Sequence, residues 1–204
     1  TPLNIAAELA EAGITILGTS VDTINLAEDR DLFRKMMERM GIPMPESGMA
    51  STLSEALDVA TRIGYPLMVR PSFVLGGRGM EVVHDEEMLR EYVVKAVDVT
   101  PERPILIDRF LVNALECEAD ALADGDNAFV PAVMEHIELA GIHSGDSACV
   151  IPPVNISQHH LDTIYDYTRR IARELKVGGR MNMQDAIENG TGYVLEANPR
   201  AARP

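Results

Sequence analysis

Residues 66–84 read PLMVRPSFVLGGRGMEVVH, and they contain the most distinctive pattern in the chain. Its apolar ends, 66–70 and 80–84, predict two strands joined by a glycine-rich loop. The loop lacks the Gly-Lys-Ser/Thr ending of a Walker loop, and a strand pattern rather than a helix pattern follows it. An anion site at a helix N-terminus is therefore not expected here. A flap whose backbone amides close over a bound anion and an ordinary flexible hairpin both remain open.

The residues before this stretch are mainly helical in pattern. Residues 2–9 predict a helix, Gly13 ends it, and 14–17 predict a short strand, which together indicate the remnant of an α/β unit. Residues 30–40 carry apolar side chains at helical spacing. A further helix begins at a capping box, TLSE at 52–55.

Strands dominate the rest of the chain. Helices are predicted at 85–97 and 157–177, and strands at 104–110, 115–123, 129–137, 180–187 and 193–197. The order predicts an α+β fold in three parts: an α/β remnant at 1–27, a smaller lobe at 28–110 that contains the glycine-rich loop, and a larger lobe at 111–204. Both ends interrupt a pattern, so we expect a segment of a longer protein.

The last two strands present oxygen donors on one face. Glu196 and Asn198 stand two residues apart on a strand and therefore point the same way. A five-residue loop at 188–192 would place Gln184 directly opposite Glu196. A tight two-residue turn would place it opposite Leu195 instead, on the other face. Three such donors suit magnesium, so a metal-binding function predicts the wider loop, and a solvated hairpin face is the alternative.

Four arginines stand near these features. Arg70 ends the strand before the glycine-rich loop, and Arg109 lies near the end of another strand. Arg200 and Arg203 follow the hairpin. Single arginines are usually surface residues, but a group beside a glycine loop and oxygen donors suits phosphoryl transfer, which depends on positioning and charge neutralisation.

Composition excludes several classes of protein. The chain has 32 Asp and Glu against 18 Lys and Arg, a net charge of −14, which argues against a nucleic-acid partner. Two cysteines, Cys117 and Cys149, imply neither a disulfide framework nor a zinc site, and reduced thiols in the cytoplasm are expected. No segment has the pattern of a membrane span or a signal peptide. The Ser-His-Asp combination at 141–148 lacks the spacing of a strained Gly-x-Ser-x-Gly turn, so a serine hydrolase is not expected.

Together these segments resemble the large subunit of carbamoyl-phosphate synthetases, which are ATP-grasp enzymes. The resemblance runs over essentially the whole chain and rests on motifs in the family's order and spacing: LGTS at 17–20, AEDR at 27–30, RPSFVLGGR at 70–78, MEHIE at 134–138, GIHSGDSA at 141–148 and EANPR at 196–200. Residues 74–78 and 134–138 resemble the second of the family's two halves, which phosphorylates carbamate. The resemblance implies an ATP-grasp fold, in which two α+β lobes grip ATP.

The same resemblance implies roles for individual residues. Gln184, Glu196 and Asn198 would bind Mg²⁺ or Mn²⁺ at the nucleotide. Arg200 and Arg203, with Asn198, would be the catalytic groups that hold carbamate or its phosphate. Further residues would contact ATP or its phosphates: Arg30, Arg70, Gly76, Gly77, Arg109, Leu111, Glu116, Met134, Gly141, Ile142, His143 and Ser144.

Two positions depart from the family pattern. Asp185 stands where the family usually has an apolar aromatic residue, and strand alternation points it into the core, where an unpaired carboxylate is costly. It must find a partner, or the hairpin must pack differently. Leu139 stands where glutamine is common, which weakens the analogy for a potassium ion near Glu116, His136 and Ser144.

The resemblance implies ATP-dependent phosphorylation of carbamate to carbamoyl phosphate, for arginine or pyrimidine biosynthesis. The implied partners are the remainder of the large subunit and a glutaminase small subunit, with neither nucleic acid nor membrane. Two alternatives stay open: another ATP-grasp carboxylate ligase, and a non-catalytic nucleotide-binding module.

Overall fold

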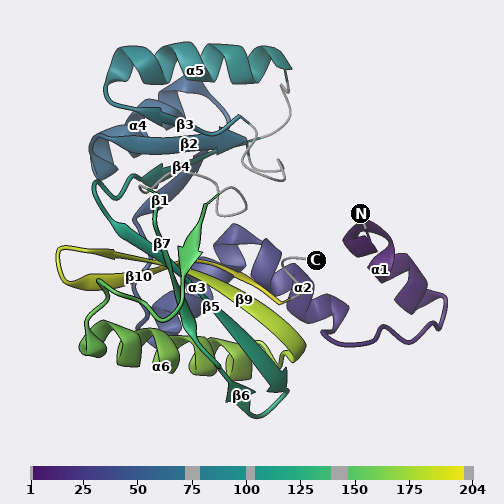
Figure 1. Cartoon of the computed structure of the whole chain (residues 1–204). Helices are drawn as coiled ribbons and strands as arrows, with labels where there is room; N and C mark the ends of the chain where they lie inside the picture. The colour runs from purple at the N-terminus through teal and green to yellow at the C-terminus, as the bar shows by residue number, and fades with distance from the viewer. Residues whose placement is uncertain (1, 72–78, 100–103, 139–146, 200–204) are drawn as a thin grey trace. The chain divides into compact units, whose positions relative to one another are not determined.

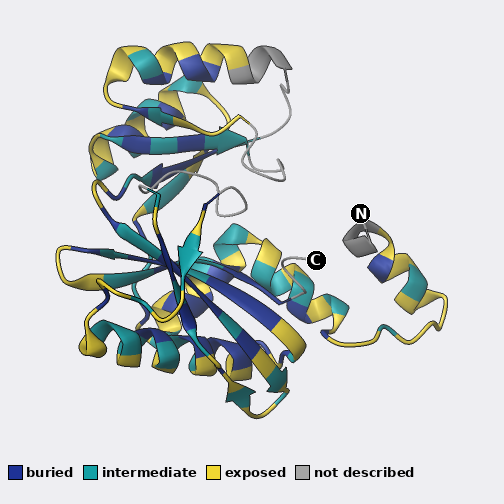
Figure 2. Cartoon of the chain, in the orientation of Figure 1, coloured by how far each residue is buried: buried dark blue, intermediate teal, exposed yellow. Residues whose placement is uncertain are grey.

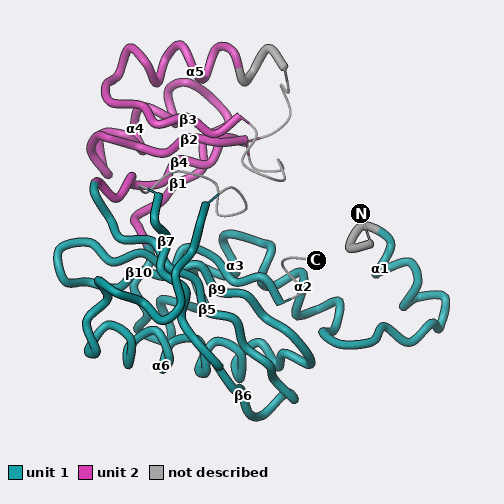
Figure 3. The backbone as a smooth tube through the Cα atoms, viewed as in Figure 1, with its two compact units in different colours: residues 1–44, 113–204 teal, residues 45–112 magenta. Residues whose placement is uncertain are grey.

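The computed structural model describes residues 2–71, 79–99, 104–138 and 147–199. The chain forms two compact units, one made of Thr1–Met44 with Asn113–Pro204 and the other of Pro45–Val112 (Figure 3). Each unit has its own sheet and its own apolar core. Helices accompany both sheets, so the α+β class is confirmed.

The smaller unit is a four-stranded antiparallel sheet with two helices. The strands lie in the order β1-β4-β2-β3 and are Ser47–Ala50 (β1), Leu67–Pro71 (β2), Glu81–Val83 (β3) and Ile105–Arg109 (β4). Helices α4 (Leu53–Ile63) and α5 (Glu86–Val99) cover one face (Figure 1). Ala60, Val69 and Ile107 belong to the core between the helices and the sheet.

Local signals in the sequence begin and end these elements. The Thr52 side chain accepts a hydrogen bond from the Glu55 N–H at 3.2 Å, so the expected capping box does begin α4. Gly64 follows the helix with φ of 85°, a conformation that favours glycine. Strands β2 and β3 stand on either side of the glycine-rich stretch, and residues 72–78 of that stretch lie outside the described part.

The larger unit is built on a six-stranded antiparallel sheet. Its strands lie in the order β10-β9-β5-β7-β8, with β6 beside β5. They are β5 (Leu115–Asp124), β6 (Ala128–Phe129), β7 (Val133–His136), β8 (Cys149–Val150), β9 (Gly178–Glu188) and β10 (Thr191–Asn198). Helix α6 (Gln158–Glu174) packs against this sheet through buried residues such as Ile164 and Ile171, and its outward side is exposed (Figure 2).

Three helices open the chain: α1 (Pro2–Glu11), α2 (Val21–Glu28) and α3 (Arg30–Met40). Helix α3 buries Phe33, Met36 and Met37 in the same core as Ile164 of α6. The expected boundary at residue 28 is therefore corrected, because α3 belongs to the larger unit and the smaller unit begins at Pro45. The apolar stripe of a helix shows that one face is buried, but it does not show which sheet covers that face.

Two expected strands differ in the structure. Residues 14–17 belong to neither sheet, and Leu17 is 90% exposed, so the strand expected there is wrong. The strand expected at 129–137 divides into β6 and β7 around Pro131, since proline has no N–H for a strand ladder. Among the helices in the described part of the chain, none is long and apolar enough to cross a membrane.

Candidate functional site

The β9–β10 hairpin carries the three expected metal ligands. Its turn is tight: Glu188 pairs with Thr191, and the two residues between them, Asn189 and Gly190, have φ of 51° and 80°. Positive φ at both positions is the geometry that an Asn-Gly hairpin turn favours. The wider loop expected for a metal-binding hairpin is therefore wrong.

A bulge in β10 restores the pairing that this turn would otherwise prevent. Val194 pairs with Asp185, and the next pair is Glu196 with Gln184, so Leu195 is the additional residue. Residues directly opposite in an antiparallel pair point to the same side of the sheet. Gln184 and Glu196 therefore share a face despite the tight turn.

Strand β5 adds carboxylates to this face. Glu118 is in register with Gln184, and Asp120 is in register with Asn182, which also pairs with Asn198. The Asn182 Nδ2 donates to Glu118 Oε2 and to Asp120 Oδ1, at 3.0 Å in each case. The face is thus a connected polar surface over β5, β9 and β10, which we call the acidic face.

Glu118, Asp120 and Asn182 were not among the residues expected at this site. A signal for two of them was present, because LECEADA at 115–121 alternates acidic and apolar residues, as a strand with one polar face does. Asn182 had no such signal. Its importance comes from the register between β5 and β9, which joins segments about sixty residues apart.

Gln184, Glu196 and Asn198 are a donor set that fits a hard divalent cation. They offer one carboxylate and two amide oxygens, the ligand chemistry that Mg²⁺ prefers. The Asn198 Nδ2 donates to Glu196 Oε1 at 2.9 Å, which orients the amide beside the carboxylate. Among the described residues, no three His, Cys, Asp or Glu side chains form a metal cluster, and the candidate set depends on its amides instead.

His136 extends the acidic face, and it lies between two carboxylates. Its Nδ1 is 3.6 Å from Glu116 Oε2 and its Nε2 is 3.3 Å from Glu118 Oε1, so the contacts are ion pairs rather than well-formed hydrogen bonds. The contacts with Glu116 and then with Glu118 raise the pKa of His136 to about 9, although burial acts in the opposite direction. At neutral pH the ring is therefore an imidazolium that offsets part of the negative charge.

Comparison with known proteins identifies the family. The family described as the ATP-binding domain of the carbamoyl-phosphate synthase L chain matches residues 29–204. This chain belongs to that family. The carbamoyl phosphate synthase large chain of Archaeoglobus fulgidus is 57% identical over 203 residues, which are 100% of this chain and 19% of that protein. The C-terminal section of the large chain from Methanocaldococcus jannaschii is 52% identical over 203 residues, which are 100% of this chain and 33% of that one.

Solved structures show the fold of this synthase family member. Biotin carboxylase from Campylobacter jejuni matches with a TM-score of 0.83 at 20% identity, over 98% of this chain and 46% of that one. D-alanyl-alanine synthetase A from Vibrio cholerae matches with a TM-score of 0.81 at 16% identity, over 97% of this chain and 63% of that one. These likenesses confirm the ATP-grasp fold.

Asp185 lies on the other side of the β9–β10 hairpin. It is paired in register with Cys117 and Val194, and it is 2% exposed. Its Oδ2 has no hydrogen-bond partner among the described residues. Burial raises the pKa of Asp185 to about 8, so the folded chain keeps this carboxyl protonated at neutral pH. The core-facing orientation expected from strand alternation is confirmed.

Glu135 of the MEHIE motif has a structural role on this same side of the sheet. Its Oε2 accepts hydrogen bonds from the N–H groups of Val154 and Asn155, both at 2.7 Å. Burial raises the pKa of Glu135, but hydrogen bonds from the main chain of residues 154–156 and from the Asn155 side chain together outweigh burial and hold the pKa below its ordinary value. The carboxylate therefore ties β7 to the loop before α6.

The remaining expected residues fall into three groups. In the smaller unit, the Arg70 Nη2 lies 3.7 Å from Asp108 Oδ2, Arg109 ends β4, and Leu111 is 6% exposed. In the larger unit, Met134 pairs with Glu118 at the acidic face, and the Arg30 guanidinium donates to a main-chain carbonyl of β10. The rest lie outside the described residues: Gly76, Gly77, Gly141, Ile142, His143, Ser144, Arg200 and Arg203.

Proposed function

We propose that this chain is the ATP-grasp unit of the carbamate-phosphorylating, C-terminal half of a carbamoyl phosphate synthase large chain. The observation that carries the proposal is the pairing of Gln184 with Glu196 on the acidic face, with Asn198 two residues further on. Identity of 52% and 51% to C-terminal sections from Methanocaldococcus jannaschii and Aquifex aeolicus supports the choice of half. The reaction takes MgATP and carbamate to ADP and carbamoyl phosphate, for arginine or pyrimidine biosynthesis in the cytoplasm.

In this proposal Gln184, Glu196 and Asn198 hold Mg²⁺ or Mn²⁺. The bound ion would neutralise charge on the phosphates and on the oxygens between which the phosphoryl group moves. Glu116 and Glu118 lie on the same face, and these carboxylates would repel a bare polyphosphate. We therefore expect the nucleotide to bind more tightly with its cation than alone.

The chain's other groups would act by positioning, because phosphoryl transfer needs no covalent enzyme intermediate. Glu116 and Met134 would contact the nucleoside. Contacts with ATP or its phosphates would come from Arg70, Arg109, Leu111 and the glycine flap with Gly76 and Gly77. Arg200 and Arg203 would hold carbamate. The remainder of the large chain and a glutaminase subunit are the proposed partners.

Potassium is proposed only through oxygen ligands. Both ring nitrogens of His136 face carboxylates, at 3.6 Å and 3.3 Å, and the ring is cationic at neutral pH. The His136 side chain is therefore no ligand for a monovalent cation. Glu116 and Ser144 would supply oxygen ligands.

The test is synthesis of ATP from carbamoyl phosphate and MgADP, the reverse of the proposed step. The activity of the Glu196→Ala variant should be lower by about 100-fold or more, because the substitution removes the carboxylate from the three proposed metal ligands. Glu87→Ala is the matched control, because Glu87 is exposed on α5 in the smaller unit. Circular dichroism should show an unchanged fold in both variants.

Two results would argue against the proposal. If Glu196→Ala kept the activity of the unaltered chain, the metal assignment would be wrong. If the unaltered chain bound MgADP, measured by calorimetry, but made no ATP, this segment would be a nucleotide-binding module without activity of its own.

A further inference from the structure

The β10 bulge decides whether the proposed metal ligands share a face. With the tight turn alone, the pairing of Asp185 with Val194 would be followed by Gln184 opposite Leu195. A slip of one residue moves every later side chain to the other side of the sheet. Glu196 and Asn198 would then point away from Gln184. The additional residue at Leu195 prevents this.

Two main-chain groups at the bulge form hydrogen bonds with the segment of the chain that contains α3. The Leu195 carbonyl accepts a hydrogen bond from the Arg30 Nη1 at 2.7 Å. The Val194 N–H donates to the Pro43 carbonyl at 2.9 Å. Arg30 begins α3 and Pro43 follows its end, so the α3 segment binds the outer edge of β10 at the bulge. Because β10 is the edge strand of its sheet, no further strand of that sheet can supply these bonds.

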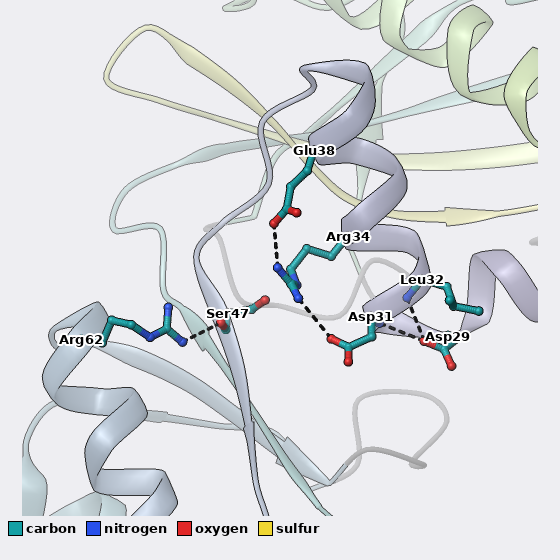
Figure 4. Close-up of polar contacts among 7 residues, drawn as sticks. All are labelled: Asp29, Asp31, Leu32, Arg34, Glu38, Ser47 and Arg62. Carbon is teal, nitrogen blue, oxygen red and sulfur yellow. Dashed lines mark hydrogen bonds and ion pairs between the residues drawn. The ribbon is translucent and has the colours of Figure 1, made fainter.

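The N-cap of α3 and its contacts with the core hold Arg30 in place. Asp29 is the N-cap of α3, and its Oδ1 accepts hydrogen bonds from the N–H groups of Asp31 and Leu32 at 3.0 Å and 2.9 Å (Figure 4). Phe33 and Met37 anchor the helix in the apolar core of the same unit. The cap and the core together fix the point from which the Arg30 side chain reaches β10.

We infer that Arg30 is a positioning residue whose hydrogen bond to the Leu195 carbonyl holds the bulge that places Glu196 and Asn198 on the face of Gln184. The inference rests on the proposed function for its metal site. This role differs from the expected contact of Arg30 with ATP phosphates, and the observation behind it is the hydrogen bond from Nη1 to the main chain of β10. Loss of this bond loosens the register of β10 and weakens the binding of a divalent cation.

The experiment compares Mn²⁺·ADP binding with binding of ADP alone, by calorimetry and by electron paramagnetic resonance of Mn²⁺. Arg30→Met should weaken Mn²⁺·ADP binding about 10- to 100-fold, which is the usual effect of removing a group that orients metal ligands without binding the metal itself. Binding of ADP in the absence of metal should not change. Arg30→Lys keeps a donor and should recover part of the loss.

Arg34→Met is the matched control on the same helix. Arg34 forms ion pairs with Asp31 and Glu38, at 3.5 Å and 2.6 Å, within its own helix (Figure 4). Its loss should leave Mn²⁺·ADP binding unchanged. Amide exchange gives a second readout, because the Val194 N–H should exchange faster in Arg30→Met than in Arg34→Met.

Several results would overturn the inference. Unchanged Mn²⁺·ADP affinity in Arg30→Met would do so, and an equal loss of metal-free ADP binding would show direct phosphate contact instead. Failure of the proposed function looks different: the unaltered chain and Glu196→Gln would then bind Mn²⁺·ADP equally weakly. Amide exchange at Val194 would still test the Arg30 bond in that case.

Discussion

Substitution of Asp185 by asparagine should change how the stability of this chain depends on pH. The carboxyl is 2% exposed, its Oδ2 has no hydrogen-bond partner among the described residues, and burial raises its pKa from 3.8 to about 8. Asparagine has nearly the same size and does not titrate. The comparison therefore isolates the cost of keeping this group protonated in the core.

The sign and the magnitude follow from the two pKa values. Below pH 3.8 the carboxyl is protonated in both the folded and the unfolded chain, so there is no cost. Between pH 3.8 and about 8 the unfolded chain has released the proton and the folded chain keeps it. The free energy of unfolding then falls by about 1.4 kcal/mol per pH unit as pH rises. At pH 7 the accumulated cost is about 4 kcal/mol on this scale.

The assay is urea unfolding of the unaltered chain and of Asp185→Asn at pH 5, 6 and 7, with EDTA present to keep the metal site empty. The difference between the two free energies of unfolding should grow by about 3 kcal/mol from pH 5 to pH 7. Asp58→Asn, on the exposed side of α4, is the control and should show no such growth. A difference that stays constant over this range would show that Asp185 is not held protonated in the core.

Two further predictions concern groups on the opposite sides of the same sheet. The imidazole of His136 should titrate with a midpoint near pH 9 in proton NMR, and its contribution to stability, fully present below pH 6.5, should be lost as pH rises through 9. A midpoint near pH 6.5 would contradict the ion pairs with Glu116 and Glu118. Glu135→Ala should lower the free energy of unfolding by about 2 to 4 kcal/mol, because it leaves the N–H groups of Val154 and Asn155 without their acceptor. Thermal unfolding would measure this loss, and a change within 0.5 kcal/mol, the usual range for a surface substitution, would contradict it.

Sequence patterns predicted most of the elements, because the relevant signals are local. The capping box at Thr52 and the apolar stripe of α3 act within a few residues, and so the helices that they predict are present. Strand alternation correctly turned Asp185 toward the core and away from the face of its neighbour Gln184. Period-two alternation is a property of the strand itself and needs no knowledge of its neighbours.

Two conclusions required the tertiary structure. The sequence does not show which sheet covers the apolar face of α3, and the core that contains Phe33 and Ile164 assigns that helix to the larger unit. The second conclusion concerns the metal site. Taken alone, the tight Asn-Gly turn would put Gln184 and Glu196 on opposite faces and would argue against such a site. The bulge in β10 restores their pairing.

The family, the kinds of element and the chemistry of the candidate ligands could be predicted from the sequence, because they depend on residue type and spacing. That Gln184, Glu196 and Asn198 share a face became evident from the strand pairing in the folded chain. That outcome depends on a bulge at Leu195, and the bulge is bound by Arg30 and Pro43, more than 150 residues away in sequence. No local pattern encodes a contact between segments so far apart, because folding alone brings them together.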